Sequence, residues 1–202
     1  MERVILARHG ESDHNPPRVV NGDPSRPIGL TSRGVEEARE LGRRLATQHI
    51  DLCVVTEFRR THETADLALD GRDVPRLVVP ELNDPRFGEL EGRSIEDVRD
   101  FVREHGTTAP VPGGGESRVD VIRRYCDGYE LVVARPEGTA LVVAHGLPVT
   151  AVWLAARGEQ VPVSLRGMPD AYADVRSMSR AELLIGIERM HEWIREQEAA
   201  AA

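Results

Sequence analysis

The sequence predicts an α/β fold with a mostly parallel central sheet and helices on both of its faces. Short apolar runs at residues 4–7, 52–55 and 140–144 lack polar alternation, which is typical of strands buried on both faces. Stretches with apolar residues at helical spacing separate these runs, and this alternation of strands and helices favours parallel pairing. A chain of 202 residues suits a single domain whose core needs neither disulfides nor metals.

Composition argues against several classes of function. The chain carries 34 acidic and 26 basic side chains, and this acidic balance argues against a nucleic-acid partner, since nucleic-acid-binding surfaces are basic. It shows no charged-then-apolar leader and no apolar run of membrane-spanning length, so we expect a cytoplasmic protein without a membrane partner. Cys53 and Cys126 lie in a predicted strand and a predicted helix without CxxC spacing, which favours buried thiols in a reducing compartment.

Capping residues mark the predicted helix starts. A serine followed three residues later by an acidic residue opens predicted helices at Ser94, Ser117 and Ser179. We expect the first of these helices to end near residue 105 and the last near residue 196, with about six alanine-rich terminal residues frayed. We also predict an amphipathic helix from residue 32 to about 49, a short strand at 77–79, and one or two edge strands within 161–175.

Charged and polar side chains gather where the predicted strands end. They follow four strands directly or after a short loop: Arg8 and His9, Arg60, Asp84, and His145. Because the carboxyl ends of parallel strands meet at one edge of a sheet, we expect these side chains to line a common crevice. Cations beside imidazoles predict an anionic ligand and a nucleophile or base in that crevice.

Several segments resemble the histidine phosphatase superfamily, whose members have the phosphoglycerate mutase-like fold. The matching segments are Arg8-His9-Gly10, Arg60 with Thr64-Ala65, Asp84-Pro85-Arg86-Phe87-Gly88, Gly115-Glu116-Ser117 and His145-Gly146. They occur in the family's order over roughly residues 3–150, and the joint match is much more specific than any single motif. The resemblance implies a three-layer sandwich and points to the phosphatase branch of the family.

The resemblance also implies roles for the matched residues. His9 would take up the phosphoryl group, and Asp84 would be the general acid that protonates the leaving oxygen. The alignment assigns phosphate binding to Arg60 rather than to Arg59. Four further residues would bind the phosphate during catalysis, namely Arg8, Asn15, His145 and Gly146. Another four would lie at the edge of the pocket, namely Ser12, Gly22, Glu116 and Ser117. No metal and no other cofactor is implied.

Two alternatives within the site stay open. Glu81 is the main rival to Asp84 as proton donor, because composition alone cannot choose among the carboxylates of this segment. A rival hypothesis is a metal site made of His9, Glu11, Asp13 and His14. The spacing argues against this site, because the four residues lack the His-Glu-x-x-His pattern of zinc enzymes.

We therefore predict a metal-independent phosphomonoester hydrolase that acts on a small phosphorylated metabolite. The alternatives are a phosphoglycerate-type phosphomutase and a non-catalytic protein that binds a phosphate ligand. The segment from Asp84 to His145 is short for a mutase of this fold, which leaves a phosphohistidine open to water. The tryptophan common after the mutase signature is also missing, with Asp13-His14-Asn15 in its place. The sequence does not decide the oligomeric state, for which a homodimer is one alternative.

Overall fold

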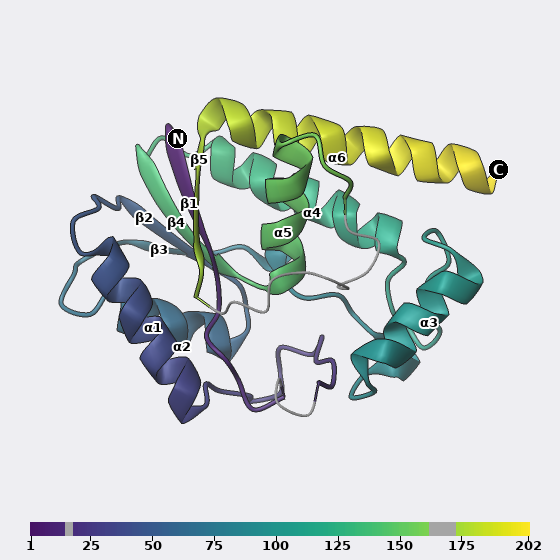
Figure 1. Cartoon of the computed structure of the whole chain (residues 1–202), viewed down its shortest axis with the longest axis horizontal. Coiled ribbons are helices and arrows are strands. Elements are labelled where there is room, and N and C mark those ends of the chain that lie inside the picture. Colours follow the sequence, from purple (N-terminus) through teal and green to yellow (C-terminus); the bar gives the residue numbers. More distant parts are fainter. Residues whose placement is uncertain (15–17, 162–172) are drawn as a thin grey trace.

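The computed structural model describes residues 1–14, 18–161 and 173–202, which form a five-stranded sheet between two layers of helices (Figure 1). The strands are β1 (Arg3–Arg8), β2 (Leu52–Val55), β3 (Arg76–Val78), β4 (Thr139–Ala144) and β5 (Val175–Ser179). Their order in the sheet is β3-β2-β4-β1-β5. The first four strands are parallel and β5 is antiparallel to β1, so the predicted α/β fold with a mostly parallel sheet is confirmed.

Successive residues of each strand point to opposite faces of the sheet, and both faces are covered. Val4 and Leu6 of β1 belong to the core on one face, whereas Ile5 and Ala7 belong to the core on the other. The first core is closed by α4 (Arg118–Val133), α5 (Gly146–Ala156) and α6 (Arg180–Ala201), and the second by α1 (Ser32–Leu45) and α2 (Arg59–Ala68). Figure 1 shows these two helix layers on opposite sides of the sheet. Burial on both faces explains why β1, β2 and β4 contain uninterrupted apolar runs, whereas β3 and β5 at the sheet edges are more exposed and more polar.

The predicted capping boxes are all present. Ser94, Ser117 and Ser179 each accept a hydrogen bond from the backbone three residues further on, at the starts of α3 (Ile95–His105), α4 and α6. Helix α1 ends earlier than predicted, because the N–H of Ala46 bonds three residues back and the chain tightens into a turn. Helix α6 continues through Ala201, where we expected fraying, and alanine is the strongest helix former. No helix in the part of the chain that the structure describes is long and apolar enough to cross a membrane.

The predicted edge strands fall mostly on residues 162–172, which lie outside the described residues. The edge strand that follows this segment is β5, which begins at Val175, the last residue of the predicted stretch. It pairs with β1 and so leaves β1 near the centre of the sheet, between β4 and β5.

Helix α3 stands apart from the sheet, toward the end where β1 terminates (Figure 1). A small apolar cluster holds it there, in which Val98 of α3 packs with Val20 and Phe87 from the loops that follow β1 and β3. Two short 3-10 turns, η1 (Pro80–Leu82) and η2 (Gly88–Leu90), shape the second of these loops.

Candidate active site

The carboxyl ends of β1 and β4 bring two histidines side by side. The backbone N–H of His9 donates to the carbonyl of Ala144 at 2.9 Å, so the parallel hydrogen-bond ladder continues one residue beyond β1. The rings of His9 and His145 then lie with their centroids 5.3 Å apart. Arg60 from α2 contacts the first ring and Asp84, which follows η1, contacts the second. We call His9, Arg60, Asp84 and His145 the histidine cluster.

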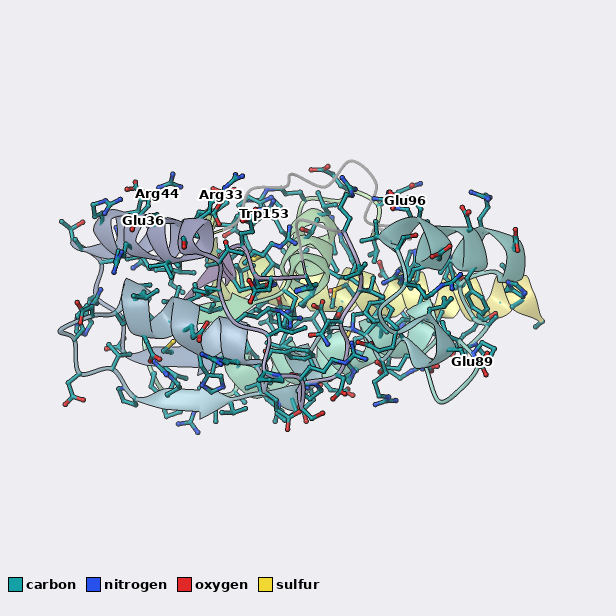
Figure 2. All side chains as sticks on the ribbon, turned by 90° about the horizontal axis from the view of Figure 1, so that it is seen from below. Arg33, Glu36, Arg44, Glu89, Glu96 and Trp153 are labelled. Carbon is teal, nitrogen blue, oxygen red and sulfur yellow. The ribbon has the colours of Figure 1, made fainter. Side chains whose placement is uncertain are left out.

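A cavity of about 310 Å³ opens onto this cluster and has the size of a small-molecule site. Its lining includes Arg8, His9, Asp84 and Gly146. Gly146 is the first residue of α5, so its backbone N–H makes no bond within the helix, an arrangement that favours an anion. Figure 2 shows the molecule from the end where β1 terminates, with Arg33 of α1 and Glu96 of α3 on opposite sides of the view.

His9 is a neutral imidazole whose lone pair is on Nε2. Its Nδ1 lies 2.7 Å from the carbonyl oxygen of Gly10, which can only accept, so Nδ1 carries the proton. The Nε of Arg60 donates to Nε2 at 3.3 Å. Burial, together with Arg60 and His145, holds the pKa of His9 well below its ordinary value. The imidazole therefore stays uncharged at neutral pH and has a lone pair on Nε2.

Two glycines let the loop after His9 lie against α1. A Cβ at Gly10 would come within 2.5 Å of the carbonyl oxygen of Gly34, and a Cβ at Gly34 would collide with the carbonyl of Glu11. This close backbone contact is possible only without side chains at both positions. The glycine of the Arg-His-Gly motif thus positions the histidine through packing.

Arg60 is completely buried and links the loops around the cluster. Its Nη1 donates to Oδ1 of Asn21 at 2.8 Å, and its Nη2 donates to Oδ2 of Asp84 at 2.7 Å. Its guanidinium also lies 4.1 Å from the centre of the Phe58 ring. The neighbouring Arg59 is exposed and pairs with Glu63 on the helix surface. The structure therefore places Arg60 inside the histidine cluster and Arg59 in solvent.

His145 is held between a carboxylate and a hydroxyl. Its Nδ1 lies 3.0 Å from Oδ2 of Asp84, and its Nε2 lies 3.0 Å from Oγ1 of Thr56. Burial lowers the pKa of His145 to about 4 although Asp84 acts to raise it, so the ring is neutral at neutral pH. Nδ1–H then donates to Asp84, and Nε2 accepts from Thr56. The tautomer of His145 is thus set by contacts on both sides of its ring.

Asp84 is ionised in this arrangement. Its partial burial acts to raise its pKa, but His145 and Arg60 outweigh this and hold the pKa of Asp84 well below its usual range. A general acid works best with a pKa near the operating pH. The proton-donor role implied by the resemblance therefore requires that the charge around Asp84 changes when substrate binds.

The four carboxylates near η1 and η2 have different surroundings. Asp84 lines the same cavity as His9, whereas Glu81 lines a second hollow that does not include His9. Glu91 accepts hydrogen bonds from the loop that follows β1, and Glu89 is exposed. This placement favours Asp84 over Glu81 as the proton donor.

The four residues predicted at the pocket edge do not line the cavity as the structure describes it. Ser12 is buried, and its Oγ lies 3.1 Å from Nδ1 of His14. Gly22 and Glu116 line the second hollow instead, and Ser117 caps α4. Gly22 and Glu116 share that hollow with Asp84, and contact of these four residues with a ligand stays a prediction.

Some residues of the site received no role from the sequence. Thr64 Oγ1 accepts from the N–H of Gly10 at 3.0 Å and so ties α2 to the loop of the first histidine. Thr56 follows directly after the strand at 52–55, and its position at a strand end could have revealed it. Asn21 lies in a loop rich in proline and glycine, where no periodic pattern marks one position. Asn15, predicted to bind the phosphate, lies outside the described residues.

The cluster also offers atoms that could bind a metal. Across residues 1–14, 18–161 and 173–202, one such group occurs, in which ligand atoms lie within 4.8 Å of one another: His9, Asp84 and His145. The rival set predicted around His9 is not brought together, and Asp13 is exposed. The guanidinium of Arg60 donates to Asp84 inside the group, so a metal ion would be bound against a positive charge. The arrangement favours an anion.

A family model matches most of the chain. The model of the histidine phosphatase superfamily (branch 1) covers residues 4–181. The 2,3-bisphosphoglycerate-dependent phosphoglycerate mutase of Methylobacterium sp. (strain 4-46) is 34% identical over 176 residues, which are 78% of this chain and 82% of the mutase. The adenosylcobalamin/alpha-ribazole phosphatase of Salmonella typhimurium is 38% identical over 96 residues, which are 48% of this chain and 46% of that one.

A solved structure shows the same similarity in three dimensions. The alpha-ribazole phosphatase from Shigella flexneri superposes with a TM-score of 0.70 at 26% identity, over 87% of this chain and 89% of that chain. The shared fold, the family match and the assembled histidine cluster agree with one another. The chain belongs to the histidine phosphatase superfamily.

Proposed function

We propose that the protein is a metal-independent phosphomonoester hydrolase that forms a phosphohistidine on His9 and acts on a small phosphorylated metabolite. The protonation state of His9 carries this proposal. Because Nδ1–H donates to Gly10, the lone pair of His9 is on Nε2, beside the guanidinium of Arg60. A neutral imidazole next to an anion-binding group is a nucleophile placed for attack on a phosphoryl group. Membership of the family supports phosphatase or mutase chemistry.

In the first half-reaction, Nε2 of His9 forms a bond to phosphorus while the bond from phosphorus to the leaving oxygen breaks. Arg8 and Arg60 stabilise the charge on the equatorial oxygens, which metal ions stabilise in kinases. In this structure Arg60 donates to Nε2 of His9. Transfer of that donor to a phosphate oxygen makes the lone pair of His9 available for attack.

The leaving oxygen takes its proton from Asp84. The guanidinium of Arg60 and the hydrogen bond from neutral His145 keep the pKa of Asp84 low; a phosphate dianion beside Arg60 offsets the guanidinium charge, so substrate binding raises that pKa. Asp84 takes up a proton from solvent and then transfers it to the alkoxide. The Nδ1–H of His145 keeps the carboxyl group oriented during this transfer.

In the second half-reaction, water attacks the phosphohistidine. Asp84, now a carboxylate, accepts a proton from the water as its oxygen bonds to phosphorus and the nitrogen–phosphorus bond breaks. His9 recovers its lone pair, and inorganic phosphate leaves.

The proposal is tested by trapping the intermediate. Denaturing the enzyme during turnover of radiolabelled phenyl phosphate should leave an acid-labile, base-stable phosphate on the peptide that contains His9. His9→Gln should trap no phosphate and lose activity by at least about 1,000-fold. His191→Gln is the matched control, because His191 lies on the exposed surface of α6. Full activity of His9→Gln would overturn the proposal.

Metal independence needs its own test, because His9, Asp84 and His145 offer ligand atoms at close range. A chelator should leave turnover unchanged, and vanadate, which adopts a trigonal bipyramid, should inhibit. If activity is lost in chelator and restored by one added metal ion, the enzyme depends on a metal, and the proposal of a metal-independent hydrolase is wrong.

A phosphoglycerate-type mutase is the second candidate, favoured by the similarity to the Methylobacterium enzyme. Enzyme primed with 2,3-bisphosphoglycerate should release phosphate faster than it interconverts 2- and 3-phosphoglycerate. The opposite order would favour the mutase. A panel of phosphomonoesters that includes alpha-ribazole phosphate then identifies the substrate, and binding without any turnover would indicate a non-catalytic phosphate-binding protein.

A further inference from the structure

Arg118 is a charged side chain of the cavity that has no role in the chemistry proposed above. Arg118 is the first residue of α4, is 8% exposed, and lines the cavity that contains His9. Removing a guanidinium from water is costly unless a carboxylate or several hydrogen bonds replace the lost hydration. A buried arginine therefore normally has a visible partner.

No such partner for Arg118 is found among the residues that the structure describes. In the part of the chain that the structure describes, its side chain makes neither a salt bridge nor a hydrogen bond, and its Nε is buried without an acceptor. Tyr125, about two turns further along α4, also has a buried hydroxyl without a partner. On the same helix, Arg124 donates to both carboxylate oxygens of Glu116. The contrast shows that Arg118 is not paired as a structural arginine is.

The position of Arg118 on the helix is unfavourable as well. A cation in the first turn lies at the positive end of the helix dipole. Burial lowers the pKa of Arg118, and Asp84 is among the groups that act against this lowering. A bound anion beside Arg118 would offset the cost of burial and the repulsion by the helix terminus.

Arg99 adds a second guanidinium from a different helix. It lies on α3, lines the same cavity, and has its Nε buried without an acceptor. Its Nη1 donates to Glu96 at 3.1 Å, which leaves the unpartnered edge of the guanidinium available to another acceptor. Two helices thus each contribute an arginine with an unsatisfied donor to one cavity.

Part of the cavity wall is apolar. Val20, Phe87, Val98 and Leu147 contribute to it, and the first three form the cluster that holds α3 in place. Such a surface is suited to a hydrocarbon or aromatic portion of a ligand. The cavity therefore combines a phosphoryl site, an apolar wall and a second pair of cations.

We propose that Arg118, with Arg99, selects a substrate that carries a second anionic group. The substrate class is a phosphomonoester whose apolar or aromatic body bears a carboxylate or a second phosphoryl group. This inference rests on the proposed function, because it places the reacting phosphoryl group at His9.

The test compares substrates that differ in the second group. Values of kcat/KM are measured for 4-carboxyphenyl phosphate, for its neutral analogue 4-carbamoylphenyl phosphate, and for 1,4-phenylene bisphosphate. A charge-assisted hydrogen bond predicts that the wild type prefers at least one anionic substrate over the neutral one by about 10- to 100-fold. The carboxylate and the bisphosphate are separate arms, so the result identifies which anion is selected.

Variants assign the preference to Arg118. Arg118→Gln should bring the ratio of anionic to neutral substrate close to one, and Arg118→Lys should retain part of the preference. Comparing this ratio between wild type and variant cancels the different leaving-group abilities of the phenols. Arg123→Gln is the matched control, because Arg123 lies on the same helix but pairs with Asp120 and Glu198 at the surface.

Each outcome is decisive. A wild type without any preference overturns the inference without the need for a variant, and a preference that survives in Arg118→Gln overturns the assignment to Arg118. If none of the three substrates is hydrolysed and no phosphohistidine is trapped, the proposed function fails, and the inference fails with it. Hydrolysis of all three at equal rates rejects the second anion site and leaves the proposed function standing.

Discussion

Two regions of one cavity differ in how their charges are paired. In the histidine cluster, Arg60 donates to Asp84 and to Asn21, and His145 lies between Asp84 and Thr56. Where α3 and α4 line the cavity, Arg118 has no salt bridge or hydrogen bond among residues 1–14, 18–161 and 173–202. Both regions hold a buried arginine, but among the described residues only the arginine of the first region has a carboxylate within salt-bridge distance.

This difference in charge pairing suits the two regions to different tasks in binding a ligand. The paired region keeps its geometry without substrate, which is what a reacting centre needs, since preorganised groups cost no reorganisation during the reaction. The unpaired region carries an unfavourable burial energy that a ligand can relieve, which is what discrimination between substrates needs. Changes in the two regions should therefore affect stability in opposite directions.

Arg60→Met should have the largest effect. It leaves Asp84 without its guanidinium and Asn21 without its donor, so we expect kcat/KM for phenyl phosphate to fall by about 1,000-fold. The unfolding free energy should fall by about 3 kcal/mol, because a partly buried carboxylate loses its counter-charge. Arg59→Gln, at the adjacent exposed position, should change neither quantity by much. The unfolding free energies are measured by urea unfolding. If Arg60→Met is more stable than the wild type, the two regions do not differ in the direction of their effect on stability.

Asp84→Asn should have the next largest effect, and the effect should depend on the leaving group. An alkoxide needs a proton to depart, whereas p-nitrophenolate does not, so the variant should slow alkyl phosphates by about 100-fold or more and p-nitrophenyl phosphate much less. Steady-state kinetics on the two substrates measure this difference. Glu81→Gln is the control at the rival carboxylate, which lines the second hollow. Equal losses on both substrates would make Asp84 a positioning residue.

The histidine cluster could be predicted from the sequence, whereas the region around Arg118 could not. Each member of the histidine cluster stands at or just after a strand end or in a family motif, and the topology of a parallel sheet brings such positions together. Strand runs and capping boxes depend on local patterns, so the sequence predicts the strand at 52–55, the helix at 94–105 and the helix start at Ser117 closely.

Other features depend on contacts that no local pattern records. The sequence indicates only that Arg118 follows the capping residue of a predicted helix, because its burial depends on how α3 and α4 pack around the cavity. Asn21 depends likewise on where one loop meets α2. The ionised state of Asp84 could not be predicted either, since it depends on distances to His145 and Arg60.

Stability should depend on pH through the histidine cluster. Burial lowers the pKa of His145 to about 4 and, with Arg60, holds that of His9 well below its ordinary value. As pH falls below about 6.5, the unfolded chain takes up protons that the folded chain does not, so stability declines toward pH 4 and is unaffected above the unfolded pKa. At pH 5 His145 should account for about 2 kcal/mol of this decline, and His9 acts in the same direction.

Urea unfolding at pH 7.5 and at pH 5 measures this decline. His9→Gln should reduce it, because one of the linked protons is removed, whereas Arg118→Gln should leave it unchanged, because arginine stays charged at both pH values. Equal stability of the wild type at the two pH values would show that the histidines are protonated in the folded state, and His9 would then not be the neutral nucleophile.

The smallest effect should be a gain in stability. Arg118→Met removes a buried charge that has no partner among the described residues and keeps a side chain of similar length. Replacing buried charges by apolar groups often stabilises a protein. We expect the unfolding free energy to rise by about 1 kcal/mol, which raises Tm by about 2–4 °C for a chain of this size. Arg124→Met is the matched variant on the same helix; it breaks the contact with Glu116 and should lower Tm. Calorimetry on both variants decides the matter. If Arg118→Met loses as much stability as Arg124→Met, then Arg118 is a structural arginine, and the proposed second anion site loses its physical basis.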